Sequence, residues 1–225
     1  MKIALILLAG GLSRRMGGAF SKAFYVHRGK SIAQYSLDVF AQIPEIGQMI
    51  VVCANSHQTH VTAQVEYALP GTERFLSLEN GLKLVDPSHK FALIHDAARP
   101  LIHLQDIKRL IELGVNSEGA ALGAPLRSTI AKVNDTLAIN AIVDRSCLWE
   151  TLTPQFAPID LLLEGIFLCK HTGKIPTDEM TLLTELGKTP RLVKSTSPNL
   201  KITYPSDLSI VCALLDQMTS EAHEI

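Results

Sequence analysis

The sequence lacks the features that mark several classes of protein. The net charge is −1 and no run of like charges stands out, so neither a nucleic-acid-binding face nor an interaction tail is expected. The four cysteines form no CxxC pair, which argues against a zinc site or a redox dithiol. We therefore expect reduced thiols in a cytoplasmic protein, at positions Cys53, Cys147, Cys169 and Cys212.

Long hydrophobic runs are also absent. The run Ile3–Leu8 is shorter than the hydrophobic core of about 7–15 residues found in a secretory signal peptide. No stretch approaches the roughly 20 apolar residues of a membrane span, so no membrane association is expected. The run is better explained as a first strand buried on both faces.

What remains is the composition of a globular domain. The 225 residues, 47% of them hydrophobic, suffice for one domain over residues 1–225. Strand-like runs at 3–8, 49–53, 91–94 and 120–124 alternate with helical spacing at 31–40, 76–85 and 104–113. This alternation predicts a doubly wound α/β fold, Rossmann-like, in which helices cover both faces of a mostly parallel sheet.

Residues 128–145 interrupt this alternation. Two strand-like runs, 129–133 and 137–143, flank Asn134-Asp135 and predict a β-hairpin. A hairpin alone is marginally stable in water, so this segment is expected to rest on its own domain or on another subunit. We call residues 125–147 the arm. Beyond it we predict helices at 158–172, 177–186 and 205–218, and strands at 190–193 and 200–203.

The loop Ala9–Lys22 is the strongest functional signal. It follows the first strand, its glycines allow backbone N–H groups to approach a polyphosphate, and Arg15 and Lys22 add two cations. Neither the P-loop nor the GxGxxG spacing occurs here, since position 12 is leucine. An ordinary glycine-rich connection is the alternative, but the paired cations favour phosphate binding.

Three further places carry polar residues of interest. In Gly71–Leu82, Ser77 at a helix start either helps to hold a base or ribose or simply caps the helix. Asp96 follows a strand, where open α/β sheets bind ligands, and suits Mg²⁺; a turn aspartate paired with Arg99 is the alternative. Arg145 and Lys201 are isolated cations, and for either one alone surface charge is the simpler reading. His95 is expected to be structural.

The loop motif Ala-Gly-x-x-x-Arg-Met-Gly followed by lysine resembles the signature of the sugar-phosphate nucleotidyltransferases. Further strings in family order make the chain similar to the 2-C-methyl-D-erythritol 4-phosphate cytidylyltransferase family of the non-mevalonate isoprenoid pathway. Those strings are Gly71–Leu82, His95–Pro100, Asp144-Arg145 with Leu148-Trp149, Thr153–Gln155, Thr177–Glu179 and Asn199–Thr203.

The resemblance implies an enzyme that transfers CMP from CTP to a phosphorylated polyol, with Mg²⁺ as cofactor. It implies that Arg15 and Lys22 stabilise the transition state and that Asp96 binds the metal. Arg145, Lys201 and Thr129 match substrate-positioning residues. Further residues match the CTP site: Ala9, Gly10, Gly11, Gly71, Thr72, Ser77 and Ala97. The arm is implied to reach the partner subunit of a homodimer.

The chain departs from the family pattern at a few positions. Ser21 stands where a proline usually precedes the lysine, and Ser128 and Ala131 replace an acid and a base at the start of the arm. The first loop also differs, since Leu8-Ala9-Gly10-Gly11 replaces Pro-Ala-Ala-Gly. The nucleotide end is therefore better supported than the acceptor end.

Other functions remain open at this point. A relative acting on ribitol 5-phosphate shares much of the signature. A molybdenum-cofactor guanylyltransferase also has an Ala-Gly-Gly loop, but the strings Thr153–Gln155 and Asn199–Thr203 argue against it. A non-catalytic nucleotide sensor would not need Arg15, Lys22 and Asp96 together.

Overall fold

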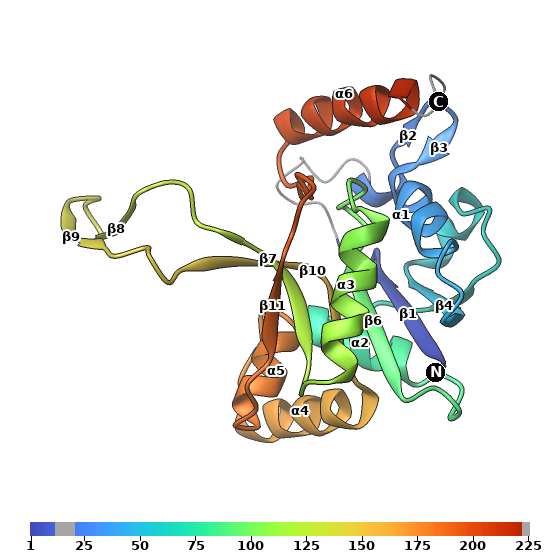
Figure 1. The fold of residues 1–225 in the computed structure, drawn as a ribbon, viewed down its shortest axis with the longest axis horizontal. Coiled ribbons are helices and arrows are strands. Elements are labelled where there is room, and N and C mark those ends of the chain that lie inside the picture. Colours follow the sequence, from blue (N-terminus) through green and yellow to red (C-terminus); the bar gives the residue numbers. More distant parts are fainter. Residues whose placement is uncertain (12–20, 222–225) are drawn as a thin grey trace.

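The computed structural model describes residues 1–11 and 21–221 of the chain. Its centre is a seven-stranded sheet of order β11-β7-β10-β6-β1-β4-β5 (Figure 1). All neighbouring strands are parallel except β10, which runs antiparallel to both β6 and β7. The predicted mostly parallel α/β architecture is confirmed.

The strands of the main sheet are β1 (Ile3–Leu8), β4 (Ile46–Val52), β5 (Glu66–Ala68), β6 (Phe91–Asp96), β7 (Ala120–Pro125), β10 (Trp149–Pro158) and β11 (Arg191–Lys194). Two small hairpins are formed by β2 (Val26–His27) with β3 (Lys30–Ser31) and by β8 (Ile130–Val133) with β9 (Ile139–Val143). The α-helices are α1 (Ile32–Phe40), α2 (Arg74–Leu82), α3 (Leu104–Val115), α4 (Ile159–Thr172), α5 (Glu179–Glu185) and α6 (Pro205–Glu221). The 3-10 helices are η2 (Lys22–Phe24) and η3 (Asn55–His60).

The strand β1 contributes side chains to both faces of the sheet. Ile3, Leu5 and Leu7 join a hydrophobic cluster with α1 and α3, whereas Ile6 joins a second cluster with α2, α4 and α5. Because both faces are covered, β1 is continuously apolar rather than alternating, as the sequence predicted. The helix α6 packs through a third, smaller cluster onto the turn after β6.

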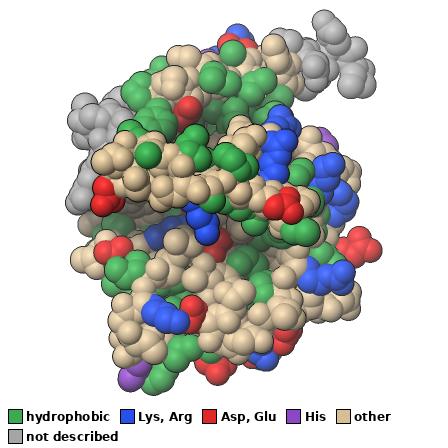
Figure 2. Space-filling view, turned by 90° about the vertical axis from the view of Figure 1, so that its left-hand side faces the viewer, with side chains coloured by type: hydrophobic (Ala, Val, Ile, Leu, Met, Phe, Trp, Pro, Cys, Tyr) green, Lys and Arg blue, Asp and Glu red, His purple; other side chains and the backbone are tan. Residues whose placement is uncertain are grey.

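The predicted hairpin is present and projects from the body as an arm (Figure 1). Its two ends leave neighbouring strands, since Pro125 of β7 pairs with Trp149 of β10. In the view from the side on which the arm projects, hydrophobic side chains lie among basic and acidic ones (Figure 2). Large apolar side chains of the arm are exposed, namely Val133, Leu137, Ile139 and Ile142.

The structure corrects several predicted boundaries. Residues 200–203 form no strand; they belong to the connection between β11 and α6. The strand β10 and the short strand β5 were not predicted, and α2 begins at Arg74 rather than at Leu76. Within residues 1–11 and 21–221, we find no helix that combines the length and the hydrophobicity needed to span a bilayer.

Candidate active site

The ends of β1, β4 and β6 meet at one edge of the sheet. Leu8 of β1 is in register with Asp96 of β6, and the backbone continues this pairing, since Ala97 donates to the carbonyl of Leu8 at 3.0 Å. Ala9 likewise donates to the carbonyl of Val52 at 2.9 Å. The start of the glycine loop and the Asp96 turn are therefore adjacent, where open α/β sheets bind ligands.

The first glycine loop packs against the second. A Cβ placed on Gly10 would lie 2.4 Å from Cβ of Pro70, so only glycine allows this approach. Gly71 is equally restricted, because an added Cβ would lie 2.6 Å from Cβ of Leu76. The predicted nucleotide-binding residues of the two segments are thus brought side by side.

Ser77 has a different local role from the cap considered for it. It is an internal residue of α2, whose N-cap is Glu73, so the helix-cap alternative is wrong. Its hydroxyl accepts a hydrogen bond from the backbone N–H of Gly71 at 3.0 Å and donates to the carbonyl of Glu73 at 3.1 Å. The side chain fixes the conformation of the Gly71 turn.

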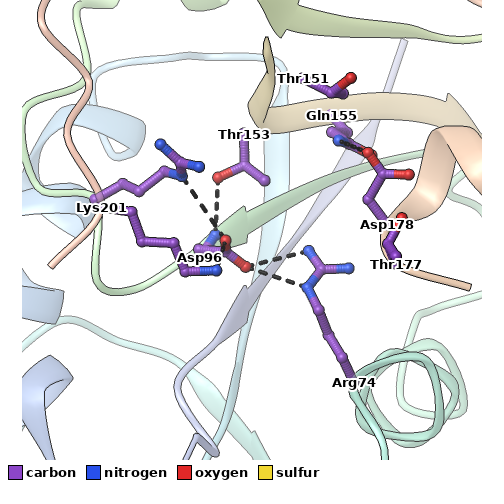
Figure 3. A pocket seen from close by; sticks show the side chains of 9 residues that line it. Arg74, Asp96, Thr151, Thr153, Gln155, Thr177, Asp178 and Lys201 are labelled. Atoms are coloured by element: carbon purple, nitrogen blue, oxygen red, sulfur yellow. Dashed lines mark hydrogen bonds and ion pairs between the residues drawn. The ribbon is translucent and has the colours of Figure 1, made fainter. Parts of the chain in front are cut away.

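The Asp96 carboxylate is surrounded by cations (Figure 3). Oδ2 lies 2.7 Å from Nζ of Lys201 and 3.7 Å from Nε of Arg99. Oδ1 lies 3.1 Å from Nη2 of Arg74. Burial alone would raise the pKa of Asp96, but the positive charges of Arg74, Lys201 and Arg99 outweigh it and hold the pKa well below its usual range. The carboxylate is therefore ionised.

These residues line a pocket of about 280 Å³. Its wall is polar and combines side chains from α2, the end of β6 and the turn after it, β10, and the segments before α5 and α6. The lining residues are Arg74, Asp96, Arg99, Thr151, Thr153, Gln155, Thr177, Asp178 and Lys201. With cations and hydroxyl groups in the majority, the pocket suits an anionic ligand with oxygen acceptors, such as a phosphate ester.

A continuous series of hydrogen bonds holds the wall of the pocket that Asp96 and Thr153 form. The Asp96 N–H donates to Oγ1 of Thr153 (3.1 Å), whose hydroxyl donates to Nδ1 of His95 (3.0 Å). Nε2 of His95 then donates to the carbonyl of Arg99 at 3.0 Å, because a carbonyl can only accept. His95 is fully buried, and burial lowers its pKa to about 3. It is neutral and bonded on both nitrogens, as expected of a structural histidine.

Asn199 connects this wall to the segment that carries Lys201. Its side-chain amide donates to the carbonyl of Thr153 at 2.8 Å, and its own carbonyl accepts from Nη1 of Arg99 at 2.8 Å. Its backbone is left-handed, with φ of 42°, a conformation that asparagine tolerates better than most residues. The bend at Asn199 places Lys201 over the pocket.

Asp106, at the start of α3, fixes the preceding part of the same segment. This fully buried carboxylate accepts from the backbone N–H and the hydroxyl of Thr196, both at 2.7 Å, and from the hydroxyl of Ser195 at 3.2 Å. Burial would raise the pKa of Asp106, but the bonds from Thr196 and from Arg109 keep it below its usual value. The segment that delivers Lys201 is therefore held at two points.

Not all predicted site residues meet in this pocket. Lys201 and Asp96 do, but Arg145 and Thr129 are exposed on the arm, where Arg145 donates to the carbonyl of Arg127. Ala97 is buried beside Asp96. Lys22 is the first residue of η2, whose Ala23 and Phe24 pack in the core, and Arg15 lies outside the described residues.

Sequence reasoning assigned no role to Arg74 or Glu179, although both lie in strings that carried the family resemblance. Nη1 of Arg74 lies 2.6 Å from Oε1 of Glu179, which is fully buried. The residues are 105 positions apart, so nothing in their local sequence indicates the pair.

The chain is similar to known proteins over nearly its whole length. A model of the protein family described as 2-C-methyl-D-erythritol 4-phosphate cytidylyltransferase matches residues 3–217. The chain is 35% identical to the enzyme of that name from Chlamydia pneumoniae, with 96% of this chain and all of that protein covered. It is 31% identical to the one from Photobacterium profundum, with 98% and 99% covered. The solved structure of the Francisella tularensis enzyme is 25% identical and superimposes with a TM-score of 0.81, covering 94% of this chain and 98% of that one.

Proposed function

The chain belongs to the 2-C-methyl-D-erythritol 4-phosphate cytidylyltransferase family, and we propose that it transfers a cytidylyl group from CTP to 2-C-methyl-D-erythritol 4-phosphate. Besides family membership, the observation that carries this proposal is the cluster of three cations around Asp96 at the carboxyl end of β6. The products are pyrophosphate and the CDP-linked alcohol, a precursor in isoprenoid biosynthesis.

The reaction joins two anions. An oxygen of the acceptor phosphate attacks the α-phosphorus of CTP, the bond to the β-phosphate oxygen breaks, and pyrophosphate leaves with the electron pair. A phosphate monoester has its second pKa at about 6, so it is largely ionised at neutral pH and needs no general base. The protein's task is to hold both anions in line and to offset the charge that develops at the α-phosphate and the leaving group.

We assign this task to a set of cations. Arg15 and Lys22 in the first loop stabilise the transition state, while Lys201 and Arg145 position the acceptor phosphate. In support, Lys201 lies in the pocket, and η2 fixes the backbone of Lys22 beside the core. The backbone groups of Ala9–Gly11 and Gly71–Thr72 bind the nucleotide, since the two turns lie side by side.

Asp96 is the residue proposed to hold Mg²⁺. Among the described residues there is no group of three or more His, Cys, Asp or Glu that would form an all-protein metal cage. A single strand-end carboxylate fits Mg²⁺, which keeps several waters and takes its remaining ligands from substrate phosphates. When bound, the ion would supply positive charge to the phosphate oxygens. Lys201 and Arg74 contact the same carboxylate, so a metal held there would have to share it with them or displace them.

The arm is proposed to complete the site across a homodimer. Arg145 and Thr129 lie on the arm and are exposed, outside the residues that line the pocket. The exposed apolar side chains of β9, Ile139 and Ile142, suit burial against a second copy of the chain. A cytoplasmic location remains a prediction.

The proposal is tested by mixing the purified protein with CTP, Mg²⁺ and one candidate acceptor at a time, and by measuring pyrophosphate release and product mass. We expect the highest kcat/KM with 2-C-methyl-D-erythritol 4-phosphate. A preference for ribitol 5-phosphate would assign the chain to the alternative acceptor. CTP binding without release of pyrophosphate from CTP in the presence of any acceptor would indicate a nucleotide sensor.

A further inference from the structure

The pair Arg74–Glu179 joins a fully buried carboxylate to a partly buried guanidinium, and the proposed chemistry leaves it without a role. The Glu179 carboxylate is fully buried and bonds Arg74 at both oxygens, Oε1 to Nη1 at 2.6 Å and Oε2 to Nη2 at 3.1 Å. The presence of Glu179 and Asp96 raises the pKa of Arg74 despite its burial, so the guanidinium is charged. A bidentate pair of this kind also fixes the orientation of the guanidinium plane.

Glu179 is itself held by the neighbouring strand. Oε1 of Gln155, in β10, accepts from the backbone N–H of Glu179 at 2.9 Å and from that of Met180 at 3.1 Å. Nε2 of Gln155 donates to Asp178, which caps α5. The first turn of α5 is thus attached to the sheet, and the position of Glu179 is set by the backbone rather than by a flexible surface.

Arg74 uses its other edge to face the pocket. Nε and Nη2 donate to Oδ1 of Asp96 at 3.3 and 3.1 Å, contacts longer than its shortest bond to Glu179. Arg74 and Lys201 approach Asp96 from opposite sides (Figure 3). Arg74 is also the first residue of α2, directly after the Gly71 turn, which places it at the nucleotide end.

A buried ion pair is a poor means of stabilising a fold, because desolvation offsets most of the attraction and apolar residues do as well. The contribution of this pair is to fix the position of the Arg74 guanidinium. A metal that binds the Asp96 carboxylate, or a phosphate that competes with it for Arg74, would free one edge of Arg74 from Asp96, while Glu179 keeps the guanidinium in place. The freed N–H groups then face the ligand without an entropic cost for ordering a long side chain.

We propose that Arg74 binds the phosphates of the nucleotide and that Glu179 is the positioning residue that orients it. This inference rests on the proposed function for the identity of the nucleotide. Glu179 touches no ligand; it acts only through Arg74.

The test is a double-mutant cycle on nucleotide affinity. The dissociation constant of CTP is measured by calorimetry, with and without Mg²⁺, for the wild type, Arg74→Gln, Glu179→Gln and the double variant. Arg74→Gln is expected to weaken CTP binding about tenfold or more, the effect of losing a charged hydrogen-bonding group. Glu179→Gln is expected to weaken it several-fold, and in the Arg74→Gln background to cause no further loss.

Thermal melting separates positioning from stability. Each single variant leaves one member of the pair without its charged partner, whereas the double variant removes both charges. The melting temperature of the double variant is therefore expected to lie closer to that of the wild type than the melting temperature of either single variant does. The double variant is still expected to bind CTP weakly. Lys170→Gln with Glu79→Gln is the matched control, since this exposed pair also links α2 to another helix, at 2.9 Å. The control is expected to leave CTP affinity unchanged.

Several outcomes overturn the inference. Unchanged CTP affinity in Glu179→Gln, or a loss that adds to that of Arg74→Gln, means that Glu179 does not act through Arg74. Failure of the wild type to bind CTP contradicts both this inference and the proposed function. If the affinities behave as expected but no product forms from methylerythritol phosphate, only the proposed function fails.

Discussion

Lys201 and Asp96 are 105 residues apart, yet Nζ of one lies 2.7 Å from Oδ2 of the other. The contact joins the residue proposed to hold Mg²⁺ to a residue proposed to position the acceptor. Since both functions use the same ion pair, occupation of either partner by a ligand changes the availability of the other.

Replacing Asp96 by asparagine removes the proposed metal ligand and leaves Arg74 and Lys201 without their shared anion. We expect kcat to fall by about 10²–10³, the effect typical of losing one preorganised electrostatic group. Steady-state kinetics over a Mg²⁺ titration check this, together with calorimetric Mg²⁺ binding in the presence of CTP. Asp160→Asn, an exposed aspartate at the start of α4, is the control. Unaltered Mg²⁺ dependence in Asp96→Asn would contradict the metal assignment.

Substitution of Lys201 or Arg145 by alanine is expected to act mainly on the acceptor. Each loses a cation proposed to hold the acceptor phosphate, so the KM for the phosphorylated alcohol should rise about tenfold or more while the KM for CTP changes little. Initial rates measured with each substrate varied in turn distinguish the two. Lys174→Ala, which breaks an exposed ion pair with Glu185, is the control. An effect confined to the KM for CTP would show the assignment to be wrong.

The two cations of the first loop, Arg15 and Lys22, are expected to affect kcat more than CTP binding. Arg15→Ala and Lys22→Ala should each lower kcat by about 10²–10³, with a smaller loss of CTP affinity, because their charges are required most in the transition state. Single-turnover rates and equilibrium CTP binding separate the two effects. Wild-type turnover in either variant would remove that residue from the proposed mechanism.

The arm makes a specific prediction about subunit composition. If each site uses the partner's arm, mixing the impaired Arg145→Ala and Asp96→Asn chains should raise the activity at low acceptor concentration above that of either variant alone, because one site of the heterodimer then contains both native residues. Activity after joint refolding checks this, and light scattering gives the oligomeric state. Ile139→Asp is expected to shift the protein to monomers, because it places a charge on the apolar surface proposed to meet the partner. Ile139 itself is 66% exposed in the single chain. No recovery of activity in dimers known to contain both variants would rule out a shared site.

Asp106 provides a stability prediction. Asp106→Asn is expected to lower the free energy of unfolding by about 1–3 kcal/mol at pH 7, because it weakens the hydrogen bonds to the segment that carries Lys201. The pKa of Asp106 is lowered in the folded state, so its contribution is present above the unfolded value of 3.8 and is lost as the pH falls below it. Urea unfolding at several pH values should therefore show the gap between the wild type and Asp106→Asn narrowing in acid. A constant gap would mean that the carboxylate charge is not involved.

Much of the fold follows from local patterns, and the exceptions have physical causes. The parallel strands buried on both faces are continuously apolar and were predicted, although β4 starts earlier than expected. The strand β10 was missed because Thr151, Thr153 and Gln155 are polar and Pro154 interrupts the run. Those polar side chains serve the pocket wall and the anchoring of α5, and the pairing register shifts between Thr151 and Gln155.

The residues of the candidate site likewise divide into those that the local sequence indicates and those that only tertiary contacts bring together. Asp96 and the glycine turns have local sequence signatures, a strand end and a close backbone approach, and the structure brings them to the same end of the sheet. Residues 200–203 looked like a strand from composition, but the left-handed bend at Asn199 and its bonds to Thr153 and Arg99 take the chain across the pocket instead. The pair of Arg74 with Glu179 depends on tertiary contacts alone.

The geometry of the arm's base makes it exchangeable. Leu126 donates to the carbonyl of Leu148 at 3.1 Å, so the chain enters and leaves the arm through two strands already joined by hydrogen bonds. A segment whose two ends are hydrogen-bonded to each other can be removed or replaced without a change in the strand register of the main sheet. Recombination among relatives that exchanges only this segment would change the arm proposed to position the acceptor and leave the glycine turns proposed to bind the nucleotide unchanged.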